Sequence, residues 1–263
     1  MEVSLLGRTA LITGGSSGTG LAMAREFVRS GASVAIVARG QENLDKAKAE
    51  LLKLAAGHVK SAKVVAFSCD VGVAAQRAAT YAKVREALGP IDILCNNAGE
   101  SRSGGTFENI PEENWRLDLE TKTVAHMHFA RLCWDDMKAR KRGVILNTGA
   151  ISAKAGRPAA MPTSVARAGV MALTKGLAFD GGPHNIRANA LLIGSLETGQ
   201  TVRHYPNEAE RKAALAKTGE HIPLGRVGTP EEFANLATFL ASDKASYITG
   251  CAINVDGGSC PVV

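Results

Sequence analysis

The chain reads Thr13-Gly14-Gly15-Ser16-Ser17-Gly18-Thr19-Gly20 between a short apolar run and the amphipathic stretch Leu21–Arg29. This order of strand, glycine-rich turn and helix is typical of segments that hold the pyrophosphate of a dinucleotide. Gly14 permits the tight turn, Gly18 lets the phosphates approach the backbone, and Gly20 allows the helix to pack closely on the strand. Because the helix amino terminus faces the phosphates, we predict a dinucleotide site at this turn.

Short apolar runs alternate with longer amphipathic stretches along the rest of the chain. The candidate strands are Thr9–Thr13, Ser33–Ala38, Lys63–Ser68, Ile91–Cys95, Val144–Thr148, Ile186–Leu192 and Cys251–Val255. The candidate helices are Leu21–Arg29, Gln41–Ala55, Ala74–Leu88, Glu112–Ala139, Ser164–Phe179 and Pro230–Ala241. This alternation predicts an α/β fold: one Rossmann-type, doubly wound, seven-stranded parallel sheet with helices on both faces, as a single domain over residues 1–263.

One polar segment, residues 197–222, resembles an insertion after the sixth strand. Its place at the carboxyl edge of the sheet, where such folds bind ligands, predicts a substrate lid. An ordinary surface helix and loop is the alternative.

The bulk composition restricts the classes of partner and compartment. The net charge of +6 arises from 31 basic and 25 acidic residues, and the dense basic run Lys138–Arg142 suits the carbonyl end of a helix, so we expect no nucleic-acid partner. Five cysteines without C-x-x-C spacing predict a reducing setting and no metal site. The first strand begins too early for a signal peptide and no run is long enough to span a membrane, so we expect a cytoplasmic protein.

The glycine spacing T-G-x-x-x-G-x-G resembles that of the short-chain dehydrogenase/reductase family, and further motifs in the same order extend the resemblance over the whole chain. These are Cys69-Asp70-Val71, Asn96-Asn97-Ala98-Gly99, Ile186-Arg187-Ala188-Asn189, Gly194 with Thr198, and Gly250 followed by Val255-Asp256-Gly257-Gly258. The resemblance implies a cofactor site built from Gly14, Ser16, Ser17, Gly18, Thr19, Asp70, Val71, Asn97, Ala98, Gly99, Arg167, Gly194 and Thr198.

The residue that closes the second strand predicts which dinucleotide binds. An acid at this point would bond the ribose 2′-hydroxyl of NAD and repel the 2′-phosphate of NADP. The sequence has Ala38-Arg39 here, and the planar Arg39 guanidinium can pair with a phosphate, helped by the hydroxyls of Ser16 and Ser17. We therefore predict NADP(H), with a plain surface turn at Arg39 as the alternative.

The same resemblance identifies the positions in this chain at which the family has its catalytic asparagine, serine, tyrosine and lysine. Without gaps, these positions hold Lys122, Ala150, Thr163 and Arg167. A threonine hydroxyl is far less acidic than a phenol and has a shorter reach, and a guanidinium is no proton shuttle. The sequence therefore predicts that cofactor binding is retained while acid catalysis by tyrosine is lost. Our candidate catalytic residues are Lys122, Ser152, Thr163 and Arg167.

Two branches of the family offer partial precedents. The 2,4-dienoyl-CoA reductases have a small hydroxyl residue at the tyrosine position and a tyrosine at the position of Ser152, and some fungal alkaloid reductases, including Diels–Alderase-type members, have degraded tetrads that act on iminium groups. We therefore expect an NADP(H)-dependent oxidoreductase that reduces an iminium or conjugated enoyl substrate with little acid catalysis. A non-redox lyase, isomerase or cyclase, and a catalytically silent NADP(H)-binding subunit, are the alternatives.

Several assignments stay open from the sequence. Lys122 could hold an anionic substrate group, or it could point to solvent or pair with Glu120. Arg157 could orient the substrate or be a loop charge. His126 and His128 lie two apart and hence on different faces of a helix, which argues against a metal site. As the family usually does, we expect a homodimer or homotetramer, with its contact on the Glu112–Arg140 stretch, and a small-molecule substrate without a membrane partner.

Overall fold

The computed structural model describes residues 3–58, 62–99, 105–202 and 205–262. In this part of the chain the strands form one sheet of order β3-β2-β1-β4-β5-β6-β7, in which every neighbouring pair is parallel. The strands are β1 (Thr9–Thr13), β2 (Ser33–Ala38), β3 (Val64–Ser68), β4 (Ile93–Asn96), β5 (Gly143–Ala150), β6 (Ile186–Ile193) and β7 (Ala252–Val255). The predicted doubly wound parallel sheet is confirmed.

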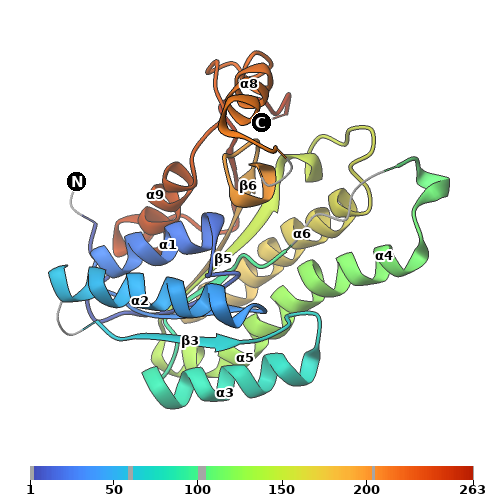
Figure 1. Cartoon of the computed structure of the whole chain (residues 1–263). Helices are drawn as coiled ribbons and strands as arrows, with labels where there is room; N and C mark the ends of the chain where they lie inside the picture. Colours follow the sequence, from blue (N-terminus) through green and yellow to red (C-terminus); the bar gives the residue numbers. More distant parts are fainter. Residues whose placement is uncertain (1–2, 59–61, 100–104, 203–204, 263) are drawn as a thin grey trace.

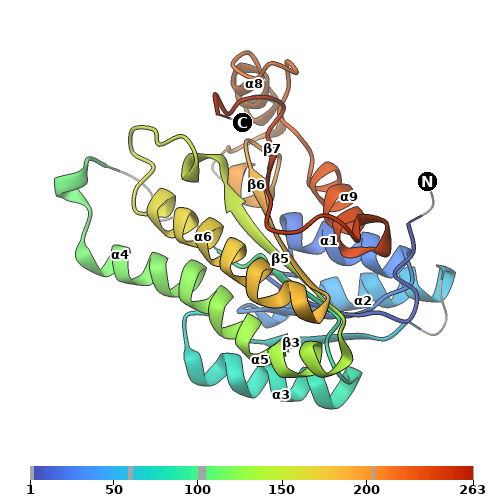
Figure 2. The same cartoon turned by 180° about the vertical axis from the view of Figure 1, so that it is seen from behind.

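Helices cover both faces of the sheet because the central strands are apolar on both sides (Figures 1 and 2). One layer consists of α1 (Gly18–Arg29), α2 (Gln41–His58) and α9 (Pro230–Ala241), whose apolar residues share a core with β1 and β2. The other consists of α3 (Ala74–Leu88), α5 (Ala125–Arg140) and α6 (Thr163–Gly181). No helix in the described part of the chain is both long and apolar enough to cross a membrane.

The long helix predicted over Glu112–Ala139 is not continuous. It consists of α4 (Glu112–Asp118), a π-helical turn, η2 (Leu119–Val124), and α5. A π turn adds one residue to a helical turn and so rotates the face that the following residues present. The hydrophobic periodicity gave no sign of this turn, which carries Lys122 into the protein interior.

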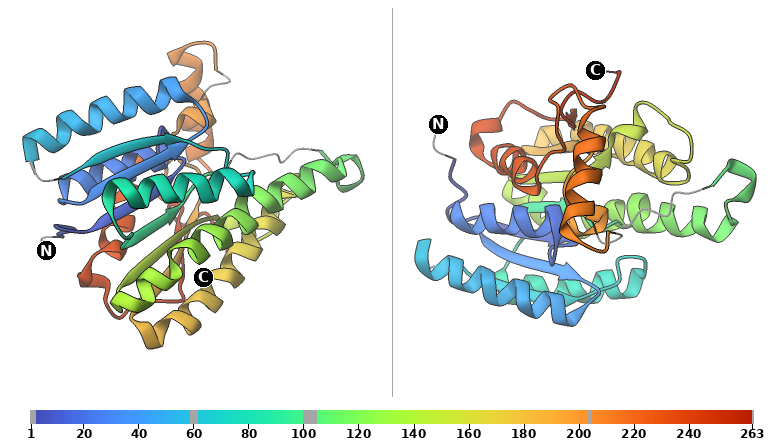
Figure 3. Two further views of the ribbon diagram at one scale, coloured as in Figure 1. Left: turned by 90° about the horizontal axis from the view of Figure 1, so that it is seen from below. Right: turned by 45° about the horizontal axis from the view of Figure 1, so that its top comes forward.

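The segment predicted as a lid lies beyond the carboxyl ends of the strands. It contains α7 (Gly199–Val202) and α8 (Glu208–Gly219), and its residues 203–204 fall outside the described part of the chain. Asn207 caps α8 by accepting a hydrogen bond from the Glu210 amide at 2.9 Å. Figure 1 shows α8, in orange, above the sheet, and in the right view of Figure 3, where the top is turned forward, α8 lies in front of the rest of the ribbon.

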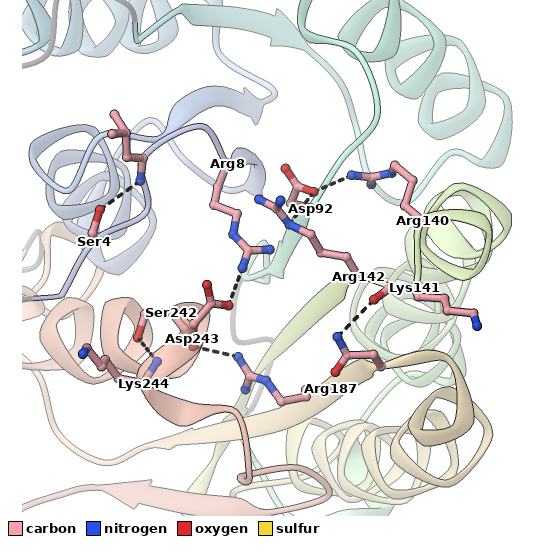
Figure 4. A network of polar contacts seen from close by, with 12 residues as sticks. Ser4, Arg8, Asp92, Arg140, Lys141, Arg142, Arg187, Ser242, Asp243 and Lys244 are labelled. Carbon is pink, nitrogen blue, oxygen red and sulfur yellow. Dashed lines mark hydrogen bonds and ion pairs between the residues drawn. The ribbon is translucent and has the colours of Figure 1, made fainter.

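A network of arginines and aspartates closes the opposite edge of the sheet, at the amino ends of the strands (Figure 4). Arg140 and Arg142 pair with Asp92, and Arg8 pairs with Asp243. Arg140 and Arg142 both belong to the basic run Lys138–Arg142 noted in the sequence, so two members of this run pair with a carboxylate. Arg187, from the Ile186–Asn189 motif, donates to the carbonyl groups of Leu240 and Ser242 at 2.7 and 3.0 Å, so this part of the motif is structural.

Candidate functional site

A cavity of about 930 Å³ opens at the carboxyl ends of the strands. All the residues that the sequence predicted as catalytic or cofactor-binding line it: Gly14, Ser16, Ser17, Gly18, Thr19, Arg39, Asp70, Val71, Asn97, Ala98, Gly99, Lys122, Ser152, Thr163, Arg167, Gly194 and Thr198. The parallel sheet explains this gathering, because the turns after β1, β2, β3, β4, β5 and β6 all emerge at the same edge.

The glycine-rich turn has the geometry of an anion site. Gly14 and Gly18 adopt φ angles of +67° and +52°, in the region that favours glycine. A Cβ on Gly20 would lie 2.1 Å from the Gly14 carbonyl oxygen, so a side chain cannot fit there. Ser17, the residue before α1, makes no side-chain cap, which leaves the first amides of α1 for a ligand.

Asn97 supports this turn through its side chain. Its Nδ2 donates to the Thr13 carbonyl at 3.1 Å, and its Oδ1 accepts from the Thr19 hydroxyl at 2.9 Å. The Thr13 hydroxyl in turn accepts from the amides of Asn97 and Ala98 at 2.9 and 3.0 Å. The motif after β4 therefore braces the phosphate turn.

The far end of the cavity holds the residues expected to meet the adenosine half of the cofactor. Arg39 is exposed directly after β2, and its carbonyl accepts from the Ser68 hydroxyl at 3.0 Å. Asp70 accepts from the Gly72 amide at 2.8 Å, which shapes the turn after β3. Buried Arg77 donates to the Val71 carbonyl and fixes the same turn from behind.

Gly194 and Thr198 lie on the turn after β6. A Cβ on Gly194 would come within 2.5 Å of Asp256, which explains a glycine at this point. The backbone at Thr198 is held by a hydrogen bond from its amide to the Thr201 hydroxyl at 2.8 Å.

Arg167 points from α6 toward the turn after β4. It is 6% exposed and donates to the Thr148 carbonyl at the end of β5. A Cβ on Gly99 would lie 2.6 Å from one of its terminal nitrogens, so the two residues touch. Burial lowers the pKa of Arg167 to about 10, while nearby Asp118 acts in the opposite direction.

Asp118, Lys122 and Thr163 form a polar cluster at the cavity, in which Asp118 and Lys122 are buried and Thr163 is partly exposed. Lys122 pairs with Asp118 one helical turn before it, and both side chains are buried. The Thr163 hydroxyl donates to the second Asp118 oxygen at 2.7 Å, and Lys122 Nζ lies 3.5 Å from Thr163 Oγ1. Lys122 therefore neither points to solvent nor pairs with Glu120, which instead binds Arg77 at 2.8 Å.

The sequence interpretation missed Asp118. The signal was present, because an aspartate four residues before a lysine on a helix is a favourable pair. Its bond to Thr163, which is 45 positions away, could not be read from spacing.

Two further polar residues face the cavity. Ser152 is 9% exposed, and its hydroxyl has no hydrogen-bond partner among the described residues. Arg157 is exposed at the rim and makes no ion pair with a described carboxylate.

His126 lies one helical turn beyond Lys122. It is buried, and neither ring nitrogen has a hydrogen-bond partner among the residues that the structure describes. Burial holds the pKa of its imidazole well below the usual value, and the charges of Arg167 and Lys122 act in the same direction. The ring is therefore neutral. His128, two residues on, accepts from Arg77 at 2.9 Å, so the two histidines face different surroundings as expected.

Comparison with known families and curated proteins covers nearly the whole chain. Residues 14–259 match the family model described as enoyl-(acyl carrier protein) reductase. The chain is 36% identical to a 3alpha-hydroxysteroid dehydrogenase of Mediterraneibacter gnavus over 98% of this chain and 99% of the relative. It is 35% identical to a probable 2,4-dienoyl-CoA reductase of Bacillus subtilis over 95% of this chain and 96% of the relative.

Solved structures show the same similarity. An L-sorbose reductase from Gluconobacter frateurii, complexed with NADPH and L-sorbose, superposes with a TM-score of 0.93 at 32% identity over 100% of both chains. A short-chain oxidoreductase from Pseudomonas aeruginosa PAO1, described as NADPH-bound and as containing an atypical catalytic center, superposes with a TM-score of 0.91. Its identity is 36% over 99% of this chain and 100% of that one.

Proposed function

This chain belongs to the short-chain dehydrogenase/reductase family, and on that premise we propose that it is an NADPH-dependent reductase with a non-standard active site that acts on a conjugated enoyl compound. The observation that carries the proposal is the polar cluster of Asp118, Lys122 and Thr163, beside Arg167. This cluster occupies the part of the cavity where the family resemblance implies a tyrosine acid.

The cofactor assignment rests on the residues at the end of β2. Arg39 is exposed at the cavity, and the described lining has no carboxylate on that turn to repel a 2′-phosphate. The guanidinium can pair with the phosphate through two hydrogen bonds. The two structural relatives cited above are NADPH complexes, which supports the same cofactor here. When bound, NADPH supplies the hydride.

The active site is proposed to be non-standard because the described cavity lining contains no tyrosine. Thr163 is the hydroxyl residue at the corresponding position of α6, and its hydrogen is donated to Asp118. A carboxylate only accepts hydrogen bonds, so Thr163 has no free hydrogen to offer a substrate carbonyl in this state. Ser152 does have one, and we assign it the role of donor to the substrate oxygen.

The charges near the cluster favour an enoyl substrate over an iminium. Lys122 and Arg167 carry two positive charges, and Asp118 offsets one of them. Asp70, at the adenosine end, is the only acid in the described lining. A net positive field repels a cationic iminium but stabilises the negative charge that hydride transfer places on an enolate oxygen.

A panel of substrates tests this function. Stopped-flow loss of NADPH absorbance should show turnover of conjugated enoyl thioesters or enones, and much slower turnover of simple ketones and of cyclic iminium salts. Ser152→Ala should slow enoyl reduction about 10²-fold, the cost of losing one donor to a developing oxyanion. Ser164→Ala is the matched control, because its hydroxyl donates to the Ala160 carbonyl just before α6 and Ser164 is not among the described residues that line the cavity.

Other outcomes would contradict the proposal. Faster turnover of ketones than of enoyl compounds would show that an effective acid meets the carbonyl directly. NADPH binding without turnover of any panel member would favour a non-redox enzyme or a silent subunit.

Two further features belong to the same proposal. We propose that residues 197–222 cover the bound substrate, because α7 and Thr198 adjoin the cavity; limited proteolysis of this segment should slow when NADPH and product are both present. We also propose a homo-oligomer through the helical layer of α5 and α6, where Met127, Val165 and Phe179 are exposed. Light scattering coupled to gel filtration tests the assembly, and a monomer would contradict it.

A further inference from the structure

We propose that Lys122 supplies the proton that completes the reduction, through the hydroxyl of Thr163, and that Asp118 positions both residues. This role rests on the proposed enoyl reduction and adds the source of its proton. In this arrangement Lys122 replaces a phenol as the acid of the site.

Among the described contacts, Thr163 links Lys122 to the open part of the cavity. The Lys122 side chain borders the cavity but is only 1% exposed, and its ammonium group pairs with Asp118. Thr163 is partly exposed, lines the cavity, and has its oxygen 3.5 Å from Lys122 Nζ. This hydroxyl can therefore carry a proton from Lys122 to a substrate in the cavity.

The acid strength of a lysine ammonium supports its use in place of a tyrosine phenol. The ordinary pKa of a lysine ammonium is about 10.4 and that of a tyrosine phenol about 10, so the two groups are acids of similar strength. Threonine alone is a poor acid, but as a relay it gains one proton while it loses another and so carries no charge. Its short side chain is sufficient because Lys122 stands directly behind it.

Asp118 holds Lys122 and Thr163 close to each other. One of its oxygens accepts from Lys122 and the other accepts from Thr163 at 2.7 Å. Its negative charge offsets the positive charge of the buried ammonium, which would be strongly disfavoured in the interior without a partner. Asp118 touches no substrate atom and is a positioning residue.

Reduction begins at the β-carbon of the enoyl group and ends with protonation of the α-carbon. Bound NADPH would supply a hydride to the β-carbon, and the electron pair of the double bond would then give an enolate. The Thr163 hydroxyl rotates from Asp118 toward the substrate, its O–H bond breaks, and a C–H bond forms at the α-carbon. One Lys122 N–H bond breaks as the threonine oxygen takes that proton, which leaves a neutral amine. After product release Lys122 regains a proton from solvent in the cavity through the Thr163 hydroxyl, so the sum is enoyl, NADPH and one proton giving saturated product and NADP⁺.

A fixed proton donor has a stereochemical consequence. Thr163 lies on one side of the cavity, so it delivers the proton to one face of the enolate. Water that enters in its absence has no fixed position and reaches both faces. The configuration at the α-carbon therefore reports on the relay, whatever the rate of hydride transfer.

The experiment uses a 2-methyl-2-enoyl thioester, whose α-carbon becomes a stereocentre on reduction, with NADPH and the full-length protein. Wild type and Thr163→Ser should give one enantiomer by chiral chromatography. Thr163→Val and Lys122→Met should lose this enantiomeric excess. Lys46→Met is the control for Lys122, since it removes a lysine that also pairs with an acid four residues before it, but on the exposed face of α2.

The outcomes separate the two proposals. If Thr163→Val, or a folded Lys122→Met, still yields a single enantiomer, the relay is wrong while enoyl reduction stands. If the wild-type protein consumes no NADPH with any enoyl probe, the proposed function is wrong and the relay falls with it. Thr163→Val keeps the buried ion pair intact, so this arm does not depend on whether Lys122→Met folds.

Discussion

The Thr163 hydroxyl lies 2.7 Å from an oxygen of Asp118, although 45 positions separate the two residues. Asp118 ends α4 and Thr163 begins α6, so this bond joins two helices at the cavity. Since the same carboxylate binds Lys122, the substrate end of the site depends on a buried charge that must remain compensated.

The first prediction concerns this buried pair. Lys122→Met should lower the free energy of unfolding by about 3–5 kcal/mol, because it leaves the Asp118 charge buried without its partner. The double variant Asp118→Asn/Lys122→Met removes both charges and should recover most of that loss. Urea unfolding monitored by circular dichroism measures all three proteins.

The exposed pair Glu42–Lys46 provides the control for stability. Its side chains are more than two-thirds exposed, and Lys46→Met should change the free energy of unfolding by no more than about 1 kcal/mol. If Lys122→Met were as mild as Lys46→Met, Lys122 would not be held as a buried cation.

Because His126 is buried, we expect the folded protein to lose stability in mild acid. Burial lowers its pKa in the folded protein, so below pH 6.5 the unfolded chain binds a proton that the folded chain refuses. The free energy of unfolding should then fall by up to about 1.4 kcal/mol per pH unit from this residue. His126→Leu should flatten the decrease between pH 6.5 and 5 in unfolding curves.

Exposed His221 is the matched control, and His221→Leu should retain the wild-type decrease. An identical pH dependence in wild type and His126→Leu would show that His126 takes up its proton in the folded state.

Arg39 should set the choice of cofactor. NADPH should bind at least about tenfold more tightly than NADH, because a charge-assisted hydrogen bond contributes about 1.5–3 kcal/mol. Arg39→Asp should abolish or reverse this preference by repelling the 2′-phosphate. Calorimetric titration with both cofactors measures the ratio, and equal affinities in the wild-type protein would defeat the assignment.

Gly18→Val should remove dinucleotide binding while the chain stays folded. Gly18 has φ near +52°, which costs a side-chain-bearing residue about 1–2 kcal/mol, and a branched side chain would stand where the pyrophosphate approaches the backbone. Binding and circular dichroism should be measured together. Gly57→Val is the control, since a Cβ there meets no atom within 4 Å; unchanged NADPH affinity in Gly18→Val would contradict the phosphate-turn assignment.

The sequence by itself determined the sheet and the cofactor end of the cavity. Apolar runs in alternation with amphipathic stretches are local signals, and the strands β1 and β2 and the helices α3 and α9 have the predicted bounds. The glycine-rich turn could also be predicted from the sequence. The backbone angles of Gly14 and Gly18 and the close contact at Gly20 require glycine at a fixed spacing. Once parallel strands are inferred, the turns that follow them must meet at one edge.

Only the tertiary structure decided what Lys122 does. The hydrophobic period of Glu112–Ala139 predicted one regular helix, but a π turn interrupts it, and Lys122 on this turn is buried against Asp118. The bond to Thr163 then depends on how α6 packs against this turn. Periodicity is set by neighbours a few residues apart, whereas a contact between distant segments depends on the packing of whole elements. That is why the glycine-rich turn could be predicted from the sequence, whereas the bond between Thr163 and Asp118 could not.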